Sequence, residues 1–368
     1  MSATALSPVL AFVGAGALGQ SFAGLLAKHG QAVTLLATQR TAASLLAAGR
    51  IRLQGVVVWD IPAVSAPAPP GSVGITTDPA DLPAGVGTIF LTKGHDLAGA
   101  IAHVRTAWPR PGDDAAWVAG LQNGLAKDDM LAAAFGASRV VPGATILGGG
   151  RGADGVVTVT SLGMTYLGEM AGGSSPRVDA AIDALMAAGI PAEAPASIQS
   201  VLWSKACNAA GVFGVSVLAR ASGPQLSGDP NLMRAYLALV RETAATGAAS
   251  GVTVGNYPNF PPIYTYAVSP DEETLSKITP GPLPRGGSLP SMTQDVLASR
   301  PMEVEQVFGD LVARAERAGV AVPHLTFVRD ILRGIDRITR GDRPPDRIAM
   351  DIGWCDAVKR ANEWGGAG

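Results

Sequence analysis

The order of apolar and polar positions divides the chain into two halves of different character. In the first half, short apolar runs of strand length alternate with segments whose apolar residues recur at helical spacing. From about residue 198 the helical period continues from one segment to the next. The apolar runs predict strands at residues 9–13, 32–36, 51–59 (a strand or a hairpin), 86–91, 115–120, 140–149, 156–160 and 164–167. The helical period predicts helices at residues 21–29, 41–48, 98–107, 175–188, 198 onward, 229–250, 292–318, 323–340 and 346–363.

Strands that alternate with helices form a parallel sheet covered on both faces, so the first half predicts an α/β, Rossmann-type doubly wound domain. The strands at 140–167 are expected to complete this sheet, and a Pro/Ala-rich loop is expected up to residue 74. The second half predicts an all-helical domain, in which Pro301 should kink or restart its helix. The change of pattern gives two domains, residues 1–195 and 196–368.

A glycine-rich turn lies between the first predicted strand and the first predicted helix. Gly14, Gly16 and Gly19 have the spacing GxGxxG, in which the glycines allow a tight turn, close approach of phosphate and close packing of helix on strand. The N-terminus of the helix that follows offers N–H groups and the positive end of its dipole to a pyrophosphate, and Ala17 and Leu18 within the motif are further candidates to bind the cofactor. A structural glycine turn is the alternative, but the strand before and the helix after favour dinucleotide binding.

The end of the second predicted strand bears on which dinucleotide is bound. NAD enzymes place an acidic side chain about 20 residues after the glycines, where it binds the ribose 2′-hydroxyl. Here no Asp or Glu precedes Asp60, whereas Thr38 offers a hydroxyl and Arg40 a guanidinium, both suited to a 2′-phosphate. Arg40 as a solvated loop charge is the alternative. The sequence therefore favours NADP(H).

Composition and charge exclude several classes of protein. The formal net charge of −2 provides no basic field for nucleic acid or anionic lipid. No apolar run reaches 18 residues and the N-terminus lacks a basic n-region, so we expect neither a membrane span nor a signal peptide. Two isolated cysteines, Cys207 and Cys355, suggest a reducing, cytoplasmic setting. The four histidines show no ligand spacing, and no metal site is expected.

Two polar residues follow predicted strands at their carboxyl ends. Lys93 comes directly after the strand at 86–91, and Asn123 follows the strand at 115–120. Ligands of doubly wound sheets bind at these ends, so both residues are candidates to bind the nicotinamide end of the cofactor. A loop charge for Lys93 and an Asn-Gly turn at Asn123 are the alternatives.

One lysine lies within an apolar stripe of the second half. At helical spacing Lys205 shares a face with Ile198, Val201, Leu202, Asn208, Ala209 and Val212. A desolvated lysine has a lowered pKa and can exchange a proton near neutrality, whereas a lysine that snorkels to solvent has no such role. Glu303 flanks another apolar stripe and by itself is typical of an ordinary surface carboxylate.

The segment 251–290 is long, dense in proline and aromatic. It contains Tyr257, Phe260, Tyr264 and Tyr266. Loops of this length without secondary structure are often functional, so the segment predicts a lid or binding loop. Packing on the helical domain or at a dimer contact is the alternative.

These motifs, in this order, resemble the ketopantoate reductase family over nearly the whole chain. The matching features are Gly14-x-Gly16-x-x-Gly19, Lys93, Gln122-Asn123-Gly124, Trp203-x-Lys205, Ser291-Met-x-Gln-Asp295-x(4)-Arg300-x-x-Glu303, Gly309 and Gly319-Val-x-Val-Pro323. The resemblance implies a Rossmann domain, a helical domain, and a cleft between them that closes on NADPH and a 2-oxo acid.

The resemblance also implies roles for individual residues. Lys205 is implied to be the general acid, and Glu303, Asn123, Lys93 and Ser291 to bind substrate or to orient the lysine. Hydride addition to a ketone develops alkoxide charge, which needs a proton donor and fixed positive charge. A lysine with a carboxylate partner supplies both.

Several positions depart from the family pattern. Members that reduce ketopantoate usually carry asparagines where this chain has Ala209, Phe213, Gly223 and Ser288. Asn208, a further candidate for substrate binding, is one residue early, which rotates it by about 100° around the helix. An arginine usually ends the second strand, where this chain has Thr38. These departures favour a larger, less polar substrate than ketopantoate.

Three functions therefore compete. The first is NADPH-dependent reduction of a ketone (a 2-oxo acid or a bulkier carbonyl) to a secondary alcohol, or the reverse oxidation. The second is reduction of ketopantoate itself, and the third is a non-catalytic protein that senses NADP(H). A sensor has no need of the proton donor Lys205. Other two-domain dehydrogenases, of the opine or hydroxyisobutyrate type, use a differently placed His or Lys. A homodimer through the helical domain is the expected assembly.

Overall fold

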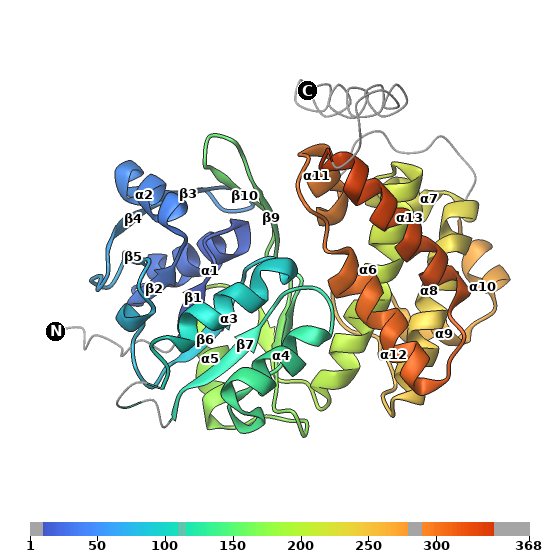
Figure 1. Ribbon diagram of the computed structural model, residues 1–368, viewed down its shortest axis with the longest axis horizontal. Helices are drawn as coiled ribbons and strands as arrows, with labels where there is room; N and C mark the ends of the chain where they lie inside the picture. The colour runs from blue at the N-terminus through green and yellow to red at the C-terminus, as the bar shows by residue number, and fades with distance from the viewer. Residues whose placement is uncertain (1–9, 110–111, 113–114, 279–288, 342–368) are drawn as a thin grey trace. The chain divides into compact units, whose positions relative to one another are not determined.

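The computed structural model describes residues 10–109, 112, 115–278 and 289–341 (Figure 1). The chain divides into two compact units, of which the first comprises Met1–Gln122 and Ala126–Leu202. The second comprises Asn123–Leu125 and Trp203–Gly368. The predicted helix at 346–363, which contains Cys355, lies outside the described residues, as does Ser288.

Five parallel strands form one side of the first unit's main sheet, in the order β5-β2-β1-β6-β7, with β7 at the edge. They are β1 (Leu10–Val13), β2 (Val33–Leu36), β5 (Val73–Thr76), β6 (Gly87–Phe90) and β7 (Trp117–Gly120). Every residue of these strands is buried, as their apolar sequences require. In chain order the arrangement is 3-2-1-4-5, so the order reverses between β1 and β6, where doubly wound sheets bind their ligands.

The edge of this sheet differs from the sequence prediction. The predicted element at 51–59 is a hairpin of β3 (Arg50–Gly55) and β4 (Trp59–Ser65), and β4 runs parallel to β5. Beyond β3 come β10 (Val157–Ser161) and β9 (Gly148–Arg151). The expectation that all strands at 140–167 join this sheet is wrong. A separate sheet consists of β8 (Gly143–Thr145), β11 (Thr165–Leu167) and β12 (Ala192–Glu193).

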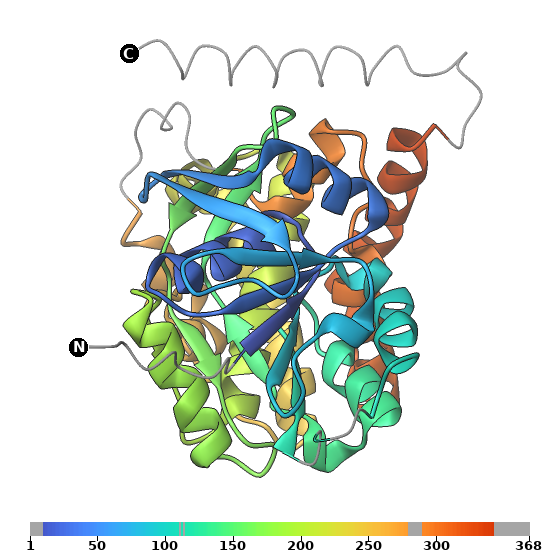
Figure 2. The same ribbon diagram turned by 90° about the vertical axis from the view of Figure 1, so that its left-hand side faces the viewer.

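Helices cover both faces of the main sheet (Figure 2). The side chains of β1 alternate between two apolar clusters, with Leu10 and Phe12 in one and Ala11 and Val13 in the other. The first cluster includes residues of α1 (Ala17–Lys28), α2 (Gln39–Ala48) and α5 (Pro176–Ala187), and the second those of α3 (Leu97–Arg105) and α4 (Ala126–Phe135). Short 3₁₀ helices lie at η1 (Pro79–Asp81), η2 (Gly94–Asp96) and η4 (Ala137–Arg139).

The second unit is helical in the part of the chain that the structure describes. Its helices are α6 (Ile198–Ala219, whose first turn belongs to the first unit), α7 (Gly223–Gly228), α8 (Pro230–Ala249), α9 (Ile263–Val268), α10 (Asp271–Leu275), α11 (Ser291–Leu297), the π-helical η5 (Glu305–Gly309), α12 (Asp310–Ala318) and α13 (Pro323–Thr339). By length and composition α6 could cross a membrane. However, 72% of its most apolar window is buried inside the protein, as in the core helix of a soluble protein.

The predicted helix at 292–318 is interrupted, as Pro301 led us to expect. It consists of α11, a connection, η5 and α12. Ser299 in the connection has a positive φ of 50°, which ends the first piece. The helix therefore restarts just after Glu303, and its first turns have π geometry, which often marks functional sites.

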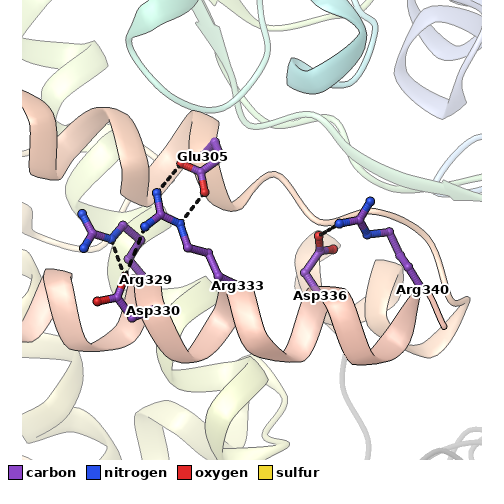
Figure 3. A network of polar contacts seen from close by, with 6 residues as sticks. All are labelled: Glu305, Arg329, Asp330, Arg333, Asp336 and Arg340. Atoms are coloured by element: carbon purple, nitrogen blue, oxygen red, sulfur yellow. Dashed lines mark hydrogen bonds and ion pairs between the residues drawn. The ribbon is translucent and has the colours of Figure 1, made fainter. Parts of the chain in front are cut away.

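A network of ion pairs joins η5 to α13 (Figure 3). The guanidinium of Arg333 donates to both carboxylate oxygens of Glu305, over 2.6 and 2.7 Å, and also contacts Asp330. These side chains are about half exposed, so solvent screens the pairs and each contributes little to stability. Arg333 nevertheless lowers the pKa of Glu305, which keeps this carboxylate ionised and in place.

The segment 251–290 is not the long irregular loop that the sequence suggested. It contains α9 and α10, which both pack on α8. Arg241 of α8 pairs with Asp271 and donates to the carbonyl of Ser269 over 2.6 Å. The Oδ1 atom of Asn256 accepts from the backbone N–H of Tyr264 over 2.9 Å and so fixes the start of α9. Residues 279–288 of this segment lie outside the described residues.

Candidate active site

The glycine-rich turn in the first unit has the geometry of a phosphate cradle. Gly14 has a φ of 106°, and a Cβ there would lie 2.7 Å from the backbone N of Thr92. A Cβ on Gly19 would collide with the carbonyl oxygen of Gly14. Gly16 differs, because a Cβ there would meet no atom within 4 Å. Two glycines thus shape the turn, and the third leaves open space beside the N-terminus of α1. The residues present therefore fit a dinucleotide pyrophosphate, for which the N–H groups of Ala17 and Leu18 at the start of α1 are the candidate donors.

Gln20 supports this turn and was missed from the sequence. Its side chain is fully buried, and its Nε2 donates to the carbonyl oxygen of Ala15 over 2.8 Å. The bond fixes the peptide between the first two glycines of the motif. A polar residue at a buried helical position is the one signal that could have indicated this role.

A cavity of about 400 Å³ lies at the carboxyl ends of β1 and β2. Its lining consists of Val13, Gly14, Leu36, Ala37, Thr38, Gln39, Thr77, Thr92, Asp96, Gly99, Ala100 and His103. It adjoins the glycine turn, as the nucleoside site of a doubly wound sheet does. His103 and Gln39 both contact Thr77, over 3.0 and 3.1 Å, and these contacts brace one wall.

The two residues predicted to select the cofactor differ in structure. Thr38 is the N-cap of α2, since its Oγ1 accepts from the N–H of Thr41 over 3.4 Å. Arg40 is exposed and lies outside the lining of the cavity, two residues after Thr38. The cavity wall also includes one carboxylate, that of Asp96 from η2. The capping role of Thr38 leaves Arg40 as the stronger candidate for contact with a 2′-phosphate.

Lys93 and Asn123 lie at strand ends as predicted, but in different units. Lys93 follows β6, is partly buried and is the N-cap residue of η2. Asn123 belongs to the second unit with Gly124 and Leu125. Gly124 has a φ of 88°, and a Cβ there would collide with the carbonyl oxygen of Gln306 in η5. Asn123 therefore lies at a tight turn against η5, as well as being a candidate ligand.

A second buried polar group lies after β7 and was not predicted. Lys127 Nζ and Asp128 Oδ2 are 2.8 Å apart, and both side chains are nearly inaccessible. Gln122, which is also buried, donates to Thr92 Oγ1 over 3.4 Å. These contacts hold the start of α4, a helix that the sequence analysis did not predict because its apolar period is weak.

Lys205 lies on a narrow accessible stripe of α6. Between residues 201 and 215 this helix is buried except at Lys205, Asn208, Val212 and Phe213. Lys205, Asn208 and Val212 are spaced i, i+3 and i+7, so they share one face. Ala209, by contrast, is 5% exposed and faces the core. The accessible polar position after the lysine is therefore residue 208, not residue 209.

The amide of Asn208 is held by an aromatic residue of α8. The hydroxyl of Tyr236 donates to Asn208 Oδ1 over 3.0 Å. The ring of Tyr236 is 2% exposed and meets that of Tyr266 edge to face, with 6.0 Å between centroids. Burial raises the pKa of both tyrosines, and burial likewise raises the pKa of the Cys207 thiol, so Cys207 is an inert core residue.

Glu303 is buried rather than exposed, contrary to what its sequence context alone suggested. It is 5% exposed and lies two residues before η5. Asp336 Oδ1 accepts from the N–H of Met302 over 2.8 Å, and Arg333 holds Glu305 on the other side. The chain is thus anchored on both sides of Glu303.

Polar side chains of the motif at residues 291–300 hold the chain at both ends of α11. Asp295 is 1% exposed and accepts from Arg300 Nε over 3.0 Å. Gln294 Nε2 donates to the carbonyl oxygen of Leu289 over 2.8 Å, at the start of α11. Ser291 is the first residue of that helix and is partly exposed.

The candidate residues are divided between the two units. Lys93 and the glycines belong to the first unit, and the second contains Lys205, Asn208, Glu303, Ser291 and Asn123. Among the described residues no group of three or more His, Cys, Asp or Glu side chains could hold a metal ion.

Two family models match the chain. The model described as "Ketopantoate reductase PanE/ApbA" matches residues 10–172, and "Ketopantoate reductase PanE/ApbA C terminal" matches residues 197–336. The chain is 27% identical over 320 residues to 2-dehydropantoate 2-reductase of Halobacterium salinarum, covering 87% of this chain and 96% of the relative. It is 21% identical over 322 residues to the protein of the same name in Pyrococcus abyssi, covering 88% and 96%.

Solved structures share the fold. A PanE/ApbA family ketopantoate reductase from Ralstonia eutropha matches with a TM-score of 0.71 and 22% identity, over 90% of this chain and 99% of that one. D-mandelate dehydrogenase, solved with NADH and anilino(oxo)acetate, matches with a TM-score of 0.71 and 18% identity, over 90% and 99%. At these identities the structural likeness shows the fold alone.

Proposed function

We propose that this chain, which belongs to the ketopantoate reductase PanE/ApbA family of NAD(P)-binding oxidoreductases, uses NADPH to reduce a 2-oxo acid that carries a bulky or aromatic part, or catalyses the reverse oxidation. The two family models confirm the family expected from the sequence, and the solved structures confirm the expected fold class. One observation carries the substrate proposal: the accessible stripe of α6 presents Lys205 and Asn208 together, next to the aromatic pair Tyr236 and Tyr266.

The proposed chemistry uses an amine, an amide and a carboxylate of the second unit. NADPH, when bound to the glycine turn, supplies the hydride that reduces the carbonyl carbon. Lys205 gives its proton to the carbonyl oxygen as negative charge develops there, and Asn208 donates a hydrogen bond to an oxygen of the acid. Glu303 provides the negative charge that favours a protonated amine. Asn123, Ser291 and Lys93 are proposed to bind substrate, and Lys93 also to contact the nicotinamide end of the cofactor.

The role of Asn208 is supported by its accessibility. Family members that reduce ketopantoate usually have an asparagine where this chain has Ala209, but Ala209 faces the core here. Asn208 is the partly exposed residue one turn beyond Lys205, so it can act in place of that asparagine. An amide able to contact the substrate is therefore retained one turn after Lys205. At the next turn, Phe213 is partly exposed where the family has a second asparagine.

An aromatic substrate follows from the side chains that remain. Phe213 and Tyr266 are partly exposed and offer apolar surface, and each buried CH₂ of a substrate contributes about 0.8 kcal/mol. D-mandelate dehydrogenase, which shares this fold, was solved with anilino(oxo)acetate, an oxo acid that carries an aromatic ring. Reduction of ketopantoate itself is the second candidate, favoured by the relative from Halobacterium salinarum, of which the match covers 96%.

NADPH rather than NADH is proposed because no acidic residue lies at the end of β2, where Arg40 is exposed. Cytoplasmic location and a homodimer through the helical unit remain proposals, and the two units are proposed to correspond to the cofactor and substrate domains.

NADPH oxidation with a panel of carbonyl compounds tests the proposed function. The panel includes phenylglyoxylate, ketopantoate, a long-chain 2-oxo acid and simple aryl ketones. We expect turnover of at least one 2-oxo acid, and a loss of that turnover in Glu303→Gln through substrate affinity or the pH profile. Tight NADPH binding with no turnover of any compound, in either direction, would support the non-catalytic sensor instead.

A further inference from the structure

The side-chain amide of Asn208 has a defined orientation in the structure. Its Oδ1 accepts the hydrogen of the Tyr236 hydroxyl over 3.0 Å. Among residues 10–109, 112, 115–278 and 289–341, no protein atom accepts from Asn208 Nδ2. The amide therefore turns its acceptor toward α8 and leaves two N–H donors on the partly exposed side of α6.

A slot in α6 makes room for the ring that holds this amide. Gly211 lies one turn after Asn208, and a Cβ at Gly211 would collide with the ring of Tyr236, lying 2.6 Å from its Cε2 atom. The glycine is costly inside a helix, by about 1 kcal/mol relative to alanine, so its presence here is explained by the close approach of the ring. Asn208, Gly211 and Tyr236 form one arrangement, in which the slot places the ring and the ring holds the amide.

The ring of Tyr236 also packs against a second aromatic ring. Tyr236 is 2% exposed, and Tyr266 of α9 meets it at an interplanar angle of 89°. Burial, with smaller effects of Tyr266 and Cys207, raises the pKa of Tyr236 well above its ordinary value. Its hydroxyl therefore stays protonated and remains a donor over the whole working range of an enzyme.

We infer that Tyr236 is a positioning residue, which orients Asn208 so that the amide N–H groups donate to an oxygen of the substrate. The inference rests on the proposed function of Asn208 as a substrate-binding residue. Without the hydroxyl, the amide can rotate and present its carbonyl oxygen to an anionic acid, which is unfavourable. Tyr236 acts through Asn208 and does not itself touch the substrate.

The first test is Tyr236→Phe, which removes one oxygen and leaves the ring in its slot. With the 2-oxo acid that the wild type reduces best in the panel, KM should rise about tenfold. The kcat value, the Kd for NADPH and the melting temperature should change little. Tyr264→Phe is the matched control, because Tyr264 is a 45% exposed tyrosine of α9 in the same unit, and it should leave KM unchanged.

A double-mutant cycle separates positioning from a merely structural role. Asn208→Ala should raise KM at least as much as Tyr236→Phe, and the double variant should be no worse than Asn208→Ala alone. Additive effects in the cycle would overturn the inference while leaving the proposed function intact. An inactive wild type, with NADPH bound, would overturn the proposed function and the inference with it.

Gly211→Ala provides an independent variant that changes neither partner of the hydrogen bond. Its methyl group should displace the ring of Tyr236 and reproduce the rise in KM, again without further effect in the Asn208→Ala background. A folded Gly211→Ala enzyme with wild-type KM would contradict the inference.

Discussion

The two units bind their proposed ligands in different ways. In the first unit the glycine turn offers backbone N–H groups and empty space. The glycines contribute because they have no side chain to fill that space. In the second unit the stripe of α6 offers side chains, whose orientation depends on residues of other helices such as Tyr236. A change of backbone shape should therefore impair cofactor binding, whereas a change of one functional group should impair chemistry or substrate selection.

Removal of the proposed proton donor should have the largest effect on activity. Lys205→Ala should lower kcat by about 10²-fold or more, the usual scale for a general acid, because no amine remains to protonate the alkoxide. The Kd for NADPH should stay unchanged, since the glycine turn belongs to the other unit. Lys277→Ala, at an exposed lysine of the same unit, is the control. A Lys205→Ala enzyme within a few-fold of wild type would make the lysine a structural residue.

Loss of the guanidinium near the cofactor cavity should alter cofactor preference. Arg40→Ala should raise the KM for NADPH roughly tenfold or more, the scale of a hydrogen bond between charged groups, and leave the KM for NADH nearly unchanged. Equal use of NADH and NADPH by the wild type would refute the proposed selectivity. Asp96, whose carboxylate lies in the cavity wall, would then be the residue to test for binding of the ribose hydroxyls.

Two glycines of the same motif should respond differently to alanine. Gly16→Ala should fold normally, since its Cβ meets nothing within 4 Å, but bind NADPH roughly tenfold more weakly, about 1.4 kcal/mol, because the methyl group occupies the space of the phosphates. Gly19→Ala should destabilise the whole unit, because its Cβ collides with the backbone at Gly14. Calorimetry and NADPH titration of both variants measure the difference. Unchanged NADPH affinity in Gly16→Ala would contradict the cradle.

A small, pH-dependent effect is expected at a site outside the proposed chemistry. Arg177 donates to both oxygens of Glu169, over 2.8 and 2.6 Å, and lowers the pKa of this carboxyl from its ordinary 4.5. A lowered folded-state pKa stabilises the protein above the unfolded value, and this stabilisation is lost as the pH falls through the folded value. Glu169→Gln should therefore lower the free energy of unfolding at pH 7 by about 1 kcal/mol. The difference from wild type should shrink below pH 4.5, and a constant difference across pH would show that the ion pair is not its cause.

The sequence predicted the first region better than the second. Strand, glycines and helix are adjacent in the chain, so the cradle at Gly14–Gly19 could be recognised locally. Strand β5 was missed because four residues among prolines and glycines give too short a pattern. The burial of Glu303, the helices within 251–275 and the bond from Tyr236 to Asn208 depend on contacts between distant segments. No local period could reveal them.

The proposed substrate class is the central claim, and one comparison tests it directly. The specificity constants kcat/KM of the wild-type protein are measured for phenylglyoxylate and for ketopantoate at saturating NADPH, with Lys205→Ala as the blank. The apolar surface of Phe213 and Tyr266 predicts that phenylglyoxylate is preferred by about tenfold or more, equivalent to about 1.4 kcal/mol. A tenfold preference for ketopantoate would contradict the account and make the chain an ordinary ketopantoate reductase.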